Sequence, residues 1–199
     1  MQMKKFLHVG CGPQYKDRLK GFSSDDWQEI RFDIDPNVNP DIQGTLTDMT
    51  LVGSESVDAI FSSHNIEHVF PHEVPLALAE FHRVLKPEGI VVITCPDLQV
   101  VCEAVVQDKL LEPLYESPAG PISPIDILYG HRQYIQEGNH YMAHKCGFTY
   151  SALGNVFMAA GFKEIFGGRR PANFDLWLVA FKANTTSEQA KTIAATFLP

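Results

Sequence analysis

Three short segments of this 199-residue sequence have residue types suited to binding a nucleoside-containing ligand beside a proton acceptor. Gly10-Cys11-Gly12-Pro13 follows an apolar stretch, and glycine there tolerates a positive φ and has no Cβ to block a ligand. Asp33 lies near the end of a second predicted strand about 20 residues later, where nucleotide-binding folds place a carboxylate that accepts hydrogen bonds from ribose hydroxyls. His64 follows a third such stretch, and its ring accepts a proton near neutral pH.

Each of these signals also has a purely structural interpretation. A Gly-x-Gly after a strand often forms only a tight turn. Asp35-Pro36-Asn37 has the composition of a turn, so we assign Asp33 to the ribose and Asp35 to the turn. His68 is expected to pack in the helix that it begins. His140 and His144 have the spacing of a metal-binding pair, but no third ligand is evident, so we predict no metal.

The segments between these residues alternate between predicted strands and helices. Strands are expected at 4–9, 28–34, 56–62 and 90–95, with a helix at 72–85 and a helix or loop up to about residue 26. This alternation predicts an open α/β sheet, in which ligands bind beyond the carboxyl ends of the strands. The glycine turn, Asp33, Asp48 and His64 should therefore lie along one rim.

The second half of the chain has a weaker pattern followed by a clear one. Residues 107–146 are rich in proline and tyrosine, and we expect a loop-rich cap over the rim, although an ordinary surface excursion is the alternative. A helix at 149–160 and two antiparallel strands at 163–167 and 174–182 follow. We therefore expect one domain at 1–183 and a C-terminal tail helix at 184–199, where Thr186 to Gln189 has the pattern of a capping box.

Composition limits the classes of partner. The net charge of -8 gives the chain no general attraction to nucleic acid or anionic lipid. The four cysteines form no Cys-x-x-Cys pair, which is typical of reduced thiols in a cytoplasmic protein. No stretch approaches the length of a membrane span. We expect a small-molecule partner, no nucleic acid and no membrane, and the oligomeric state is not indicated.

Taken in order, the motifs resemble those of the class I S-adenosylmethionine-dependent methyltransferases over about residues 4–183. The matching segments are LHVGCGP at 7–13, FDIDP at 32–36, LTDM at 46–49, VDAIFSSH at 57–64 with EHV at 67–69, HRVLKPEG at 82–89, HKCGFT at 144–149 and AGF at 160–162. The first three correspond to the cofactor loop, the ribose motif and the adenine loop of that family. The resemblance implies a Rossmann-like fold, with a mostly parallel seven-stranded sheet, an antiparallel last strand and helices on both faces.

The resemblance also implies an activity and a set of site residues. The expected reaction is methyl transfer from S-adenosyl-L-methionine to a small-molecule or saccharide-like acceptor, for which the protein mainly aligns a nucleophile with an already activated methyl group. His64 is the expected catalytic base. The implied cofactor-binding residues are His8, Gly10, Cys11, Gly12, Asp33, Ile34, Asp48, Met49, Ser63 and His64.

The sequence departs from the family pattern in three ways. The family usually has an acid where His8 stands, the third glycine of the loop is replaced near Gln14-Tyr15, and the chain starts almost at the first strand, so residues 107–146 would have to cover the substrate.

Two other functions compete with methyl transfer. A nicotinamide dehydrogenase needs Gly-x-Gly-x-x-Gly/Ala, which Tyr15 argues against. A non-catalytic module that binds S-adenosylmethionine or S-adenosylhomocysteine is the second, and His8 favours it.

Overall fold

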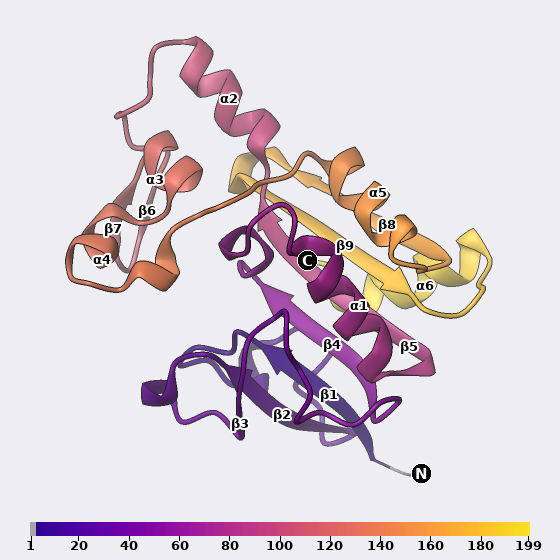
Figure 1. Cartoon of the computed structure of the whole chain (residues 1–199). Helices are drawn as coiled ribbons and strands as arrows, with labels where there is room; N and C mark the ends of the chain where they lie inside the picture. The colour runs from indigo at the N-terminus through magenta and orange to yellow at the C-terminus, as the bar shows by residue number, and fades with distance from the viewer. Residues whose placement is uncertain (1–2) are drawn as a thin grey trace.

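The computed structural model describes residues 3–199, which fold around a seven-stranded sheet in the order β3-β2-β1-β4-β5-β9-β8 (Figure 1). The pairs from β3 to β5 are parallel, and β9 runs antiparallel to both β5 and β8. The predicted Rossmann-like sheet with an antiparallel last strand is therefore confirmed. The strands are β1 (Lys4–Val9), β2 (Trp27–Asp33), β3 (Ile42–Gln43), β4 (Val57–Ser63), β5 (Leu85–Pro96), β8 (Glu164–Arg170) and β9 (Asp175–Phe181).

Two strands are longer than the sequence pattern predicts. β5 begins at Leu85 because Leu85 pairs with Val57, although the residues that follow it have the composition of a turn. β8 continues to Arg170, beyond its expected end at residue 167, because Gly168, Arg169 and Arg170 also pair with β9. Both extensions consist mainly of polar residues and glycine, and backbone pairing with the neighbouring strand makes them part of the sheet.

Two hydrophobic layers cover the two faces of the sheet, and successive residues of β1 point alternately into one layer and the other. Leu7 and Val9 face the layer formed with α1 (Val74–Val84) and α5 (Tyr150–Ala159). Phe6 faces the opposite layer, which includes α6 (Ser187–Phe197). Because side chains in a strand alternate between faces, every even-numbered residue of β1 belongs to the α6 side.

The segment between β1 and β2 contains no α-helix. It has one 3₁₀ turn at Lys16–Arg18, and Phe22 then packs on Phe6 with ring centroids 4.3 Å apart. Phe22 also contacts Phe197 of α6, with ring centroids 4.8 Å apart. The terminal helix therefore covers the sheet face together with this loop, and its capping box at Thr186 and Gln189 is present.

Residues 107–146 form a small folded unit beyond the carboxyl ends of β4 and β5 (Figure 1). Its elements follow α2 (Leu98–Val106) and are the hairpin β6 (Tyr115–Ser117) and β7 (Gly120–Ile122), then α3 (Pro124–Tyr129) and α4 (Arg132–Gln136). Val101, Ile122 and Ile127 form a separate small core beneath them. Strands and helices of three to six residues are too short to produce a clear sequence period. We call this unit the cap, and its role as a cover for the rim stays a prediction.

The cysteines form no disulfide bonds among the described residues. All four cysteines are free thiols. Burial raises the pKa of Cys11 and of Cys146 to about 11 each, so both thiols are protonated at neutral pH. Among residues 3–199, we find no helix with the length and apolar character needed to cross a membrane.

Candidate active site

A cavity of about 460 Å³ opens at the carboxyl ends of β1, β2 and β4. Five of the ten predicted cofactor-binding residues line it, namely Gly10, Gly12, Asp33, Ile34 and His64. The cap contributes Tyr141 and Met142 to the opposite wall. We call this space the rim cavity. The convergence of residues from three separate strands is the arrangement that an open parallel sheet predicts.

The glycine turn has a backbone that only glycine adopts without strain. Gly10 and Gly12 have φ values of 62° and 49°. A Cβ on Gly10 would lie 1.9 Å from Oδ1 of Asn65, whereas a Cβ on Gly12 would meet nothing within 4 Å. The Asn65 amide donates to the carbonyl oxygens of Val9 and Ser63 at 3.0 and 2.9 Å. Gly10 is therefore needed for packing of the turn, and Gly12 leaves open space for a ligand.

Asp33 is held in a fixed position at the edge of the rim cavity. The backbone N–H of Gly12 donates to its Oδ2 at 2.8 Å, and that of Asp35 donates to its Oδ1 at 2.9 Å. A carboxylate has about four lone-pair sites, so acceptor capacity remains for hydroxyl groups of a ligand. Asp35 instead accepts from the N–H of Asn37 at 2.9 Å, which agrees with its predicted role in the turn.

His8 and Cys11 are predicted site residues whose side chains do not reach the rim cavity. The His8 side chain is 3% exposed and lies on the α6 side of the sheet, with Nδ1 2.7 Å from Oε1 of Glu29. It packs edge-to-face on Phe61 at 5.3 Å between ring centroids. Burial lowers the pKa of His8, although Glu29 acts in the opposite direction. Strand alternation thus places the His8 side chain on the face of the sheet away from the rim cavity, and a cofactor contact of His8 or Cys11 stays a prediction.

Asp48, Met49 and Ser63 are also absent from the lining of the rim cavity. Asp48 is exposed and accepts from the N–H of Thr50 at 3.1 Å, and Met49 is fully buried in the core. The preceding residues line the cavity instead, from Gly44 to Thr47. The loop that carries this motif therefore borders the rim cavity, and its earlier residues line the space.

A second cavity of about 480 Å³ adjoins the first. His64, His68 and Met142 line both spaces. The remaining lining comes from the turn after β4, the end of β5, the cap and the segment that leads into β9. It includes Glu67, Tyr115, Asp126, His131, His144, Phe174 and Asp175. We call this space the cap cavity. A third cavity of about 530 Å³ lies beside α6, and its lining contains no histidine or cysteine.

His64 stands where the two cavities meet. Its backbone has a positive φ of 52°, and its N–H donates to the carbonyl oxygen of Thr94 at 2.9 Å. A left-handed backbone costs a residue with a side chain about 1–2 kcal/mol, and such strain is often found at functional sites. The side chain is 48% exposed, with Nδ1 3.3 Å from Oε1 of Glu67. Burial opposes the charged imidazole, but Glu67 outweighs it and raises the pKa of His64.

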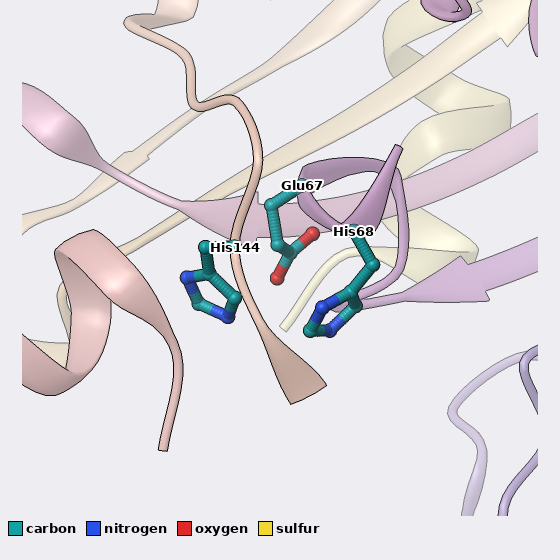
Figure 2. Close-up of side chains that lie close together, drawn as sticks. All are labelled: Glu67, His68 and His144. Carbon is teal, nitrogen blue, oxygen red and sulfur yellow. The ribbon is translucent and has the colours of Figure 1, made fainter. Parts of the chain in front are cut away.

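Glu67, His68 and His144 form a cluster that the sequence does not predict (Figure 2). The Glu67 carboxylate is 1% exposed and lies between the two imidazole rings. Burial disfavours its charge, but His64, His68 and His144 together lower the pKa of Glu67. His140, the residue considered with His144 from the sequence, is outside the cluster. Two members of the cluster, Glu67 and His68, are adjacent in the sequence shortly after β4, and this pair is a sequence signal for the cluster.

Part of the sequence matches a known protein family, and the fold matches several solved structures. Residues 7–93 match the family model described as a methyltransferase domain. Solved structures with the same fold include a protein from Bordetella parapertussis described as a possible exported protein, with a TM-score of 0.58 and 16% identity over 92% of this chain. This chain spans 62% of the length of that protein. A search among curated proteins found no match.

Two further structures are named as methyltransferases. One is the Burkholderia thailandensis 1,6-didemethyltoxoflavin-N1-methyltransferase, with bound 1,6-didemethyltoxoflavin and S-adenosylhomocysteine. It has a TM-score of 0.57 and 16% identity, over 92% of this chain and 72% of that one. The other is an S-adenosylmethionine-dependent methyltransferase from Aquifex aeolicus, with a TM-score of 0.55 and 16% identity, over 90% and 82%. At these identities the likeness concerns the fold.

Proposed function

Starting from a chain that has the class I methyltransferase fold and a methyltransferase domain match at 7–93, we propose that this protein transfers a methyl group from S-adenosyl-L-methionine to a small-molecule or saccharide-like acceptor. The observation that carries the proposal is that two cavities meet at His64. A cofactor in the rim cavity and an acceptor in the cap cavity would face each other there. Methyl transfer requires this type of alignment between donor and nucleophile.

The rim cavity has groups that match the parts of S-adenosylmethionine. Asp33 offers a fixed carboxylate for the ribose hydroxyls, and the open space at Gly12 suits close approach of the methionine part to the backbone. The loop from Gly44 to Thr47 lines the remaining end, where the adenine would lie. The cofactor supplies an activated methyl group, and the chain's own residues bind it, orient it and cover it.

The cap cavity supports an acceptor of small size. Its volume of about 480 Å³ lies within the usual range for small-molecule sites. Tyr115 and Phe174 stack with ring centroids 5.7 Å apart and provide an apolar wall, while carboxylates and imidazoles provide hydrogen-bonding groups. The Burkholderia thailandensis neighbour, whose named substrate is a small molecule, lends further support. His64 is placed to accept a proton from the nucleophile as methyl transfer proceeds.

The alternative of a non-catalytic binding module loses its main argument. That alternative depended on His8 replacing the acid usual in the family. The His8 side chain lies on the α6 side of the sheet, paired with Glu29, so its identity does not change the lining of the rim cavity. A turnover assay separates the two functions, because a module would bind S-adenosylmethionine without forming S-adenosylhomocysteine.

Asp33→Ala is expected to weaken binding of S-adenosylhomocysteine by about 1–3 kcal/mol, since the ribose hydroxyls would lose a buried acceptor. Asp48→Ala is the matched control. Its carboxylate is exposed, contacts only the Thr50 backbone among the described hydrogen bonds, and does not line the cavity, so affinity should not change. Isothermal titration calorimetry measures both variants beside the wild type.

The same calorimetric experiment tests the identity of the cofactor. The wild type should bind S-adenosylmethionine and S-adenosylhomocysteine and show no measurable binding of NAD. Binding of NAD alone would reject the proposed function and support a dehydrogenase. Equal losses of affinity for Asp33→Ala and Asp48→Ala would reject the assignment of Asp33 to the ribose.

Limited proteolysis is expected to cut the full chain first within 107–146. Exposed residues such as Leu111, Tyr129 and Tyr141 lie in this segment, and its short elements bury little apolar surface. S-adenosylhomocysteine should slow this cleavage, because Tyr141 and Met142 line the rim cavity and would contact the bound cofactor. Cleavage at the same rate with and without ligand would show that the segment does not cover the site. Mass spectrometry of the fragments identifies the cut positions.

A further inference from the structure

The carboxylate of Glu67 is an unusual group for the wall of a cavity. It is 1% exposed, and neither of its oxygens has a hydrogen-bond partner within the described part of the chain. Its closest charged neighbour in residues 3–199 is the His64 ring, at 3.3 Å. Burying a carboxylate without hydrogen bonds is strongly unfavourable unless a cation compensates it. His64 supplies one such partner, and the remaining acceptor capacity of the Glu67 carboxylate is open to a ligand.

The other two buried carboxylates of the cap cavity are each paired with an arginine. Asp126 accepts from Nε of Arg132 at 2.6 Å, and Asp175 accepts from Nε of Arg170 at 2.8 Å. Glu67 instead has imidazole rings on both sides, from His68 and His144 (Figure 2). Carboxylate and imidazole are the ligand types that divalent transition metals prefer.

Backbone hydrogen bonds hold the two imidazoles in place. Nδ1 of His144 lies 2.6 Å from the carbonyl oxygen of Ile127, and Nδ1 of His68 lies 3.1 Å from that of Ala143. A carbonyl oxygen can only accept, so Nδ1 of His144 carries the hydrogen and its Nε2 keeps a free lone pair. A second ring nitrogen bonded to a backbone carbonyl is the usual support of a metal-binding histidine.

The segment that carries His144 is tied directly to Glu67. The N–H groups of Lys145 and Cys146 donate to the carbonyl oxygen of Glu67 at 2.8 and 3.2 Å. Sγ of Cys146 also lies 3.3 Å from the carbonyl oxygen of Ile66. The two chain segments are therefore joined before any ligand binds, which lowers the cost of assembling a three-ligand site.

We propose that Glu67, His68 and His144 bind a divalent transition-metal ion, represented by Zn²⁺, at the wall of the cap cavity. The three ligand atoms lie within 4.8 Å of one another. Zinc bonded at about 2.1 Å to tetrahedral ligands brings them to about 3.4 Å, so small side-chain rotations complete the site. Three protein ligands leave a position open toward the cavity, as in zinc sites that act on a bound molecule. The metal proposal is argued from this cluster alone and does not rest on the proposed methyl transfer.

Calorimetric titration of the full chain with ZnCl₂, after treatment with a chelator, tests the proposal. The wild type should bind one zinc ion per chain. Glu67→Gln and His144→Ala should each lower the zinc affinity by about 100-fold or more, since even loss of a supporting contact costs about 10–100-fold. His140→Ala is the matched control, because His140 is exposed, lies four residues before His144 and does not belong to the cluster.

Cobalt provides a second readout that does not depend on activity. Co²⁺ should give visible absorption bands from nitrogen and oxygen ligands in the wild type and in His140→Ala, and the bands should be lost in Glu67→Gln. Circular dichroism checks that each variant is folded, and His144→Gln replaces His144→Ala if the latter unfolds. Absence of zinc binding in the wild type, or unchanged affinity in Glu67→Gln and the His144 variant, would overturn the proposal. Neither result would affect the cofactor titration.

Discussion

His64→Gln is expected to lower methyl-transfer turnover by about 10²–10⁴-fold with little change in affinity for S-adenosylhomocysteine. His64 lines both cavities, so its ring can reach an acceptor placed against the cofactor. Its backbone is left-handed, and the hydrogen bond from its N–H to Thr94 of β5 holds it there. Glutamine keeps a polar side chain of similar length but cannot accept the proton. Steady-state kinetics with a methyl acceptor measures the effect.

The separate effects of His64→Gln on kcat and on KM distinguish two roles for His64. A lower kcat with unchanged KM would support proton transfer, and a higher KM with unchanged kcat would mean that His64 only positions the acceptor. His140→Gln is the control, because His140 is exposed and lines neither cavity. Loss of folding or of cofactor binding in His64→Gln would place the residue in a structural role instead.

Gly10→Ala is expected to destabilise the protein by about 3 kcal/mol, the second large effect. The left-handed backbone accounts for about 1–2 kcal/mol. The new Cβ would also lie 1.9 Å from Asn65 and displace its amide, which costs two hydrogen bonds of about 1 kcal/mol each. Urea denaturation measures the free energy of unfolding.

Gly12→Ala is the matched variant on the same turn. Its Cβ meets no protein atom within 4 Å, so only the backbone conformation should cost stability, about 1–2 kcal/mol. The same Cβ would project into the space proposed for the cofactor, and affinity for S-adenosylhomocysteine should fall. Equal losses of stability in the two variants would contradict the different roles assigned to these glycines.

The fold and the location of the site could be predicted from the sequence because both depend on local patterns. Asp33 ends β2 and His64 directly follows β4, and parallel strands bring such ends to one rim. The position of the His8 side chain outside the rim cavity did not follow from the family resemblance, but it does follow from strand alternation. His8 is two residues from Phe6, so it shares the α6 side of the sheet.

The cap cavity and its cluster could not be predicted from spacing. Glu67 and His144 are far apart in the sequence, and they meet because the chain returns from the cap and donates two backbone hydrogen bonds to Glu67. The cap elements that precede His144 are short, and they pack on a small core around Val101 that gives little sequence period. Contacts of this kind follow from tertiary packing.

The most direct test of the proposed function is a crystal structure of the full chain with S-adenosylhomocysteine. The account predicts electron density in the rim cavity, with the ribose hydroxyls within hydrogen-bonding distance of Asp33. It also predicts that the sulfur atom lies at the His64 junction and faces the cap cavity. Density that places the ribose away from Asp33, or the sulfur on a side closed off from the cap cavity, would contradict it.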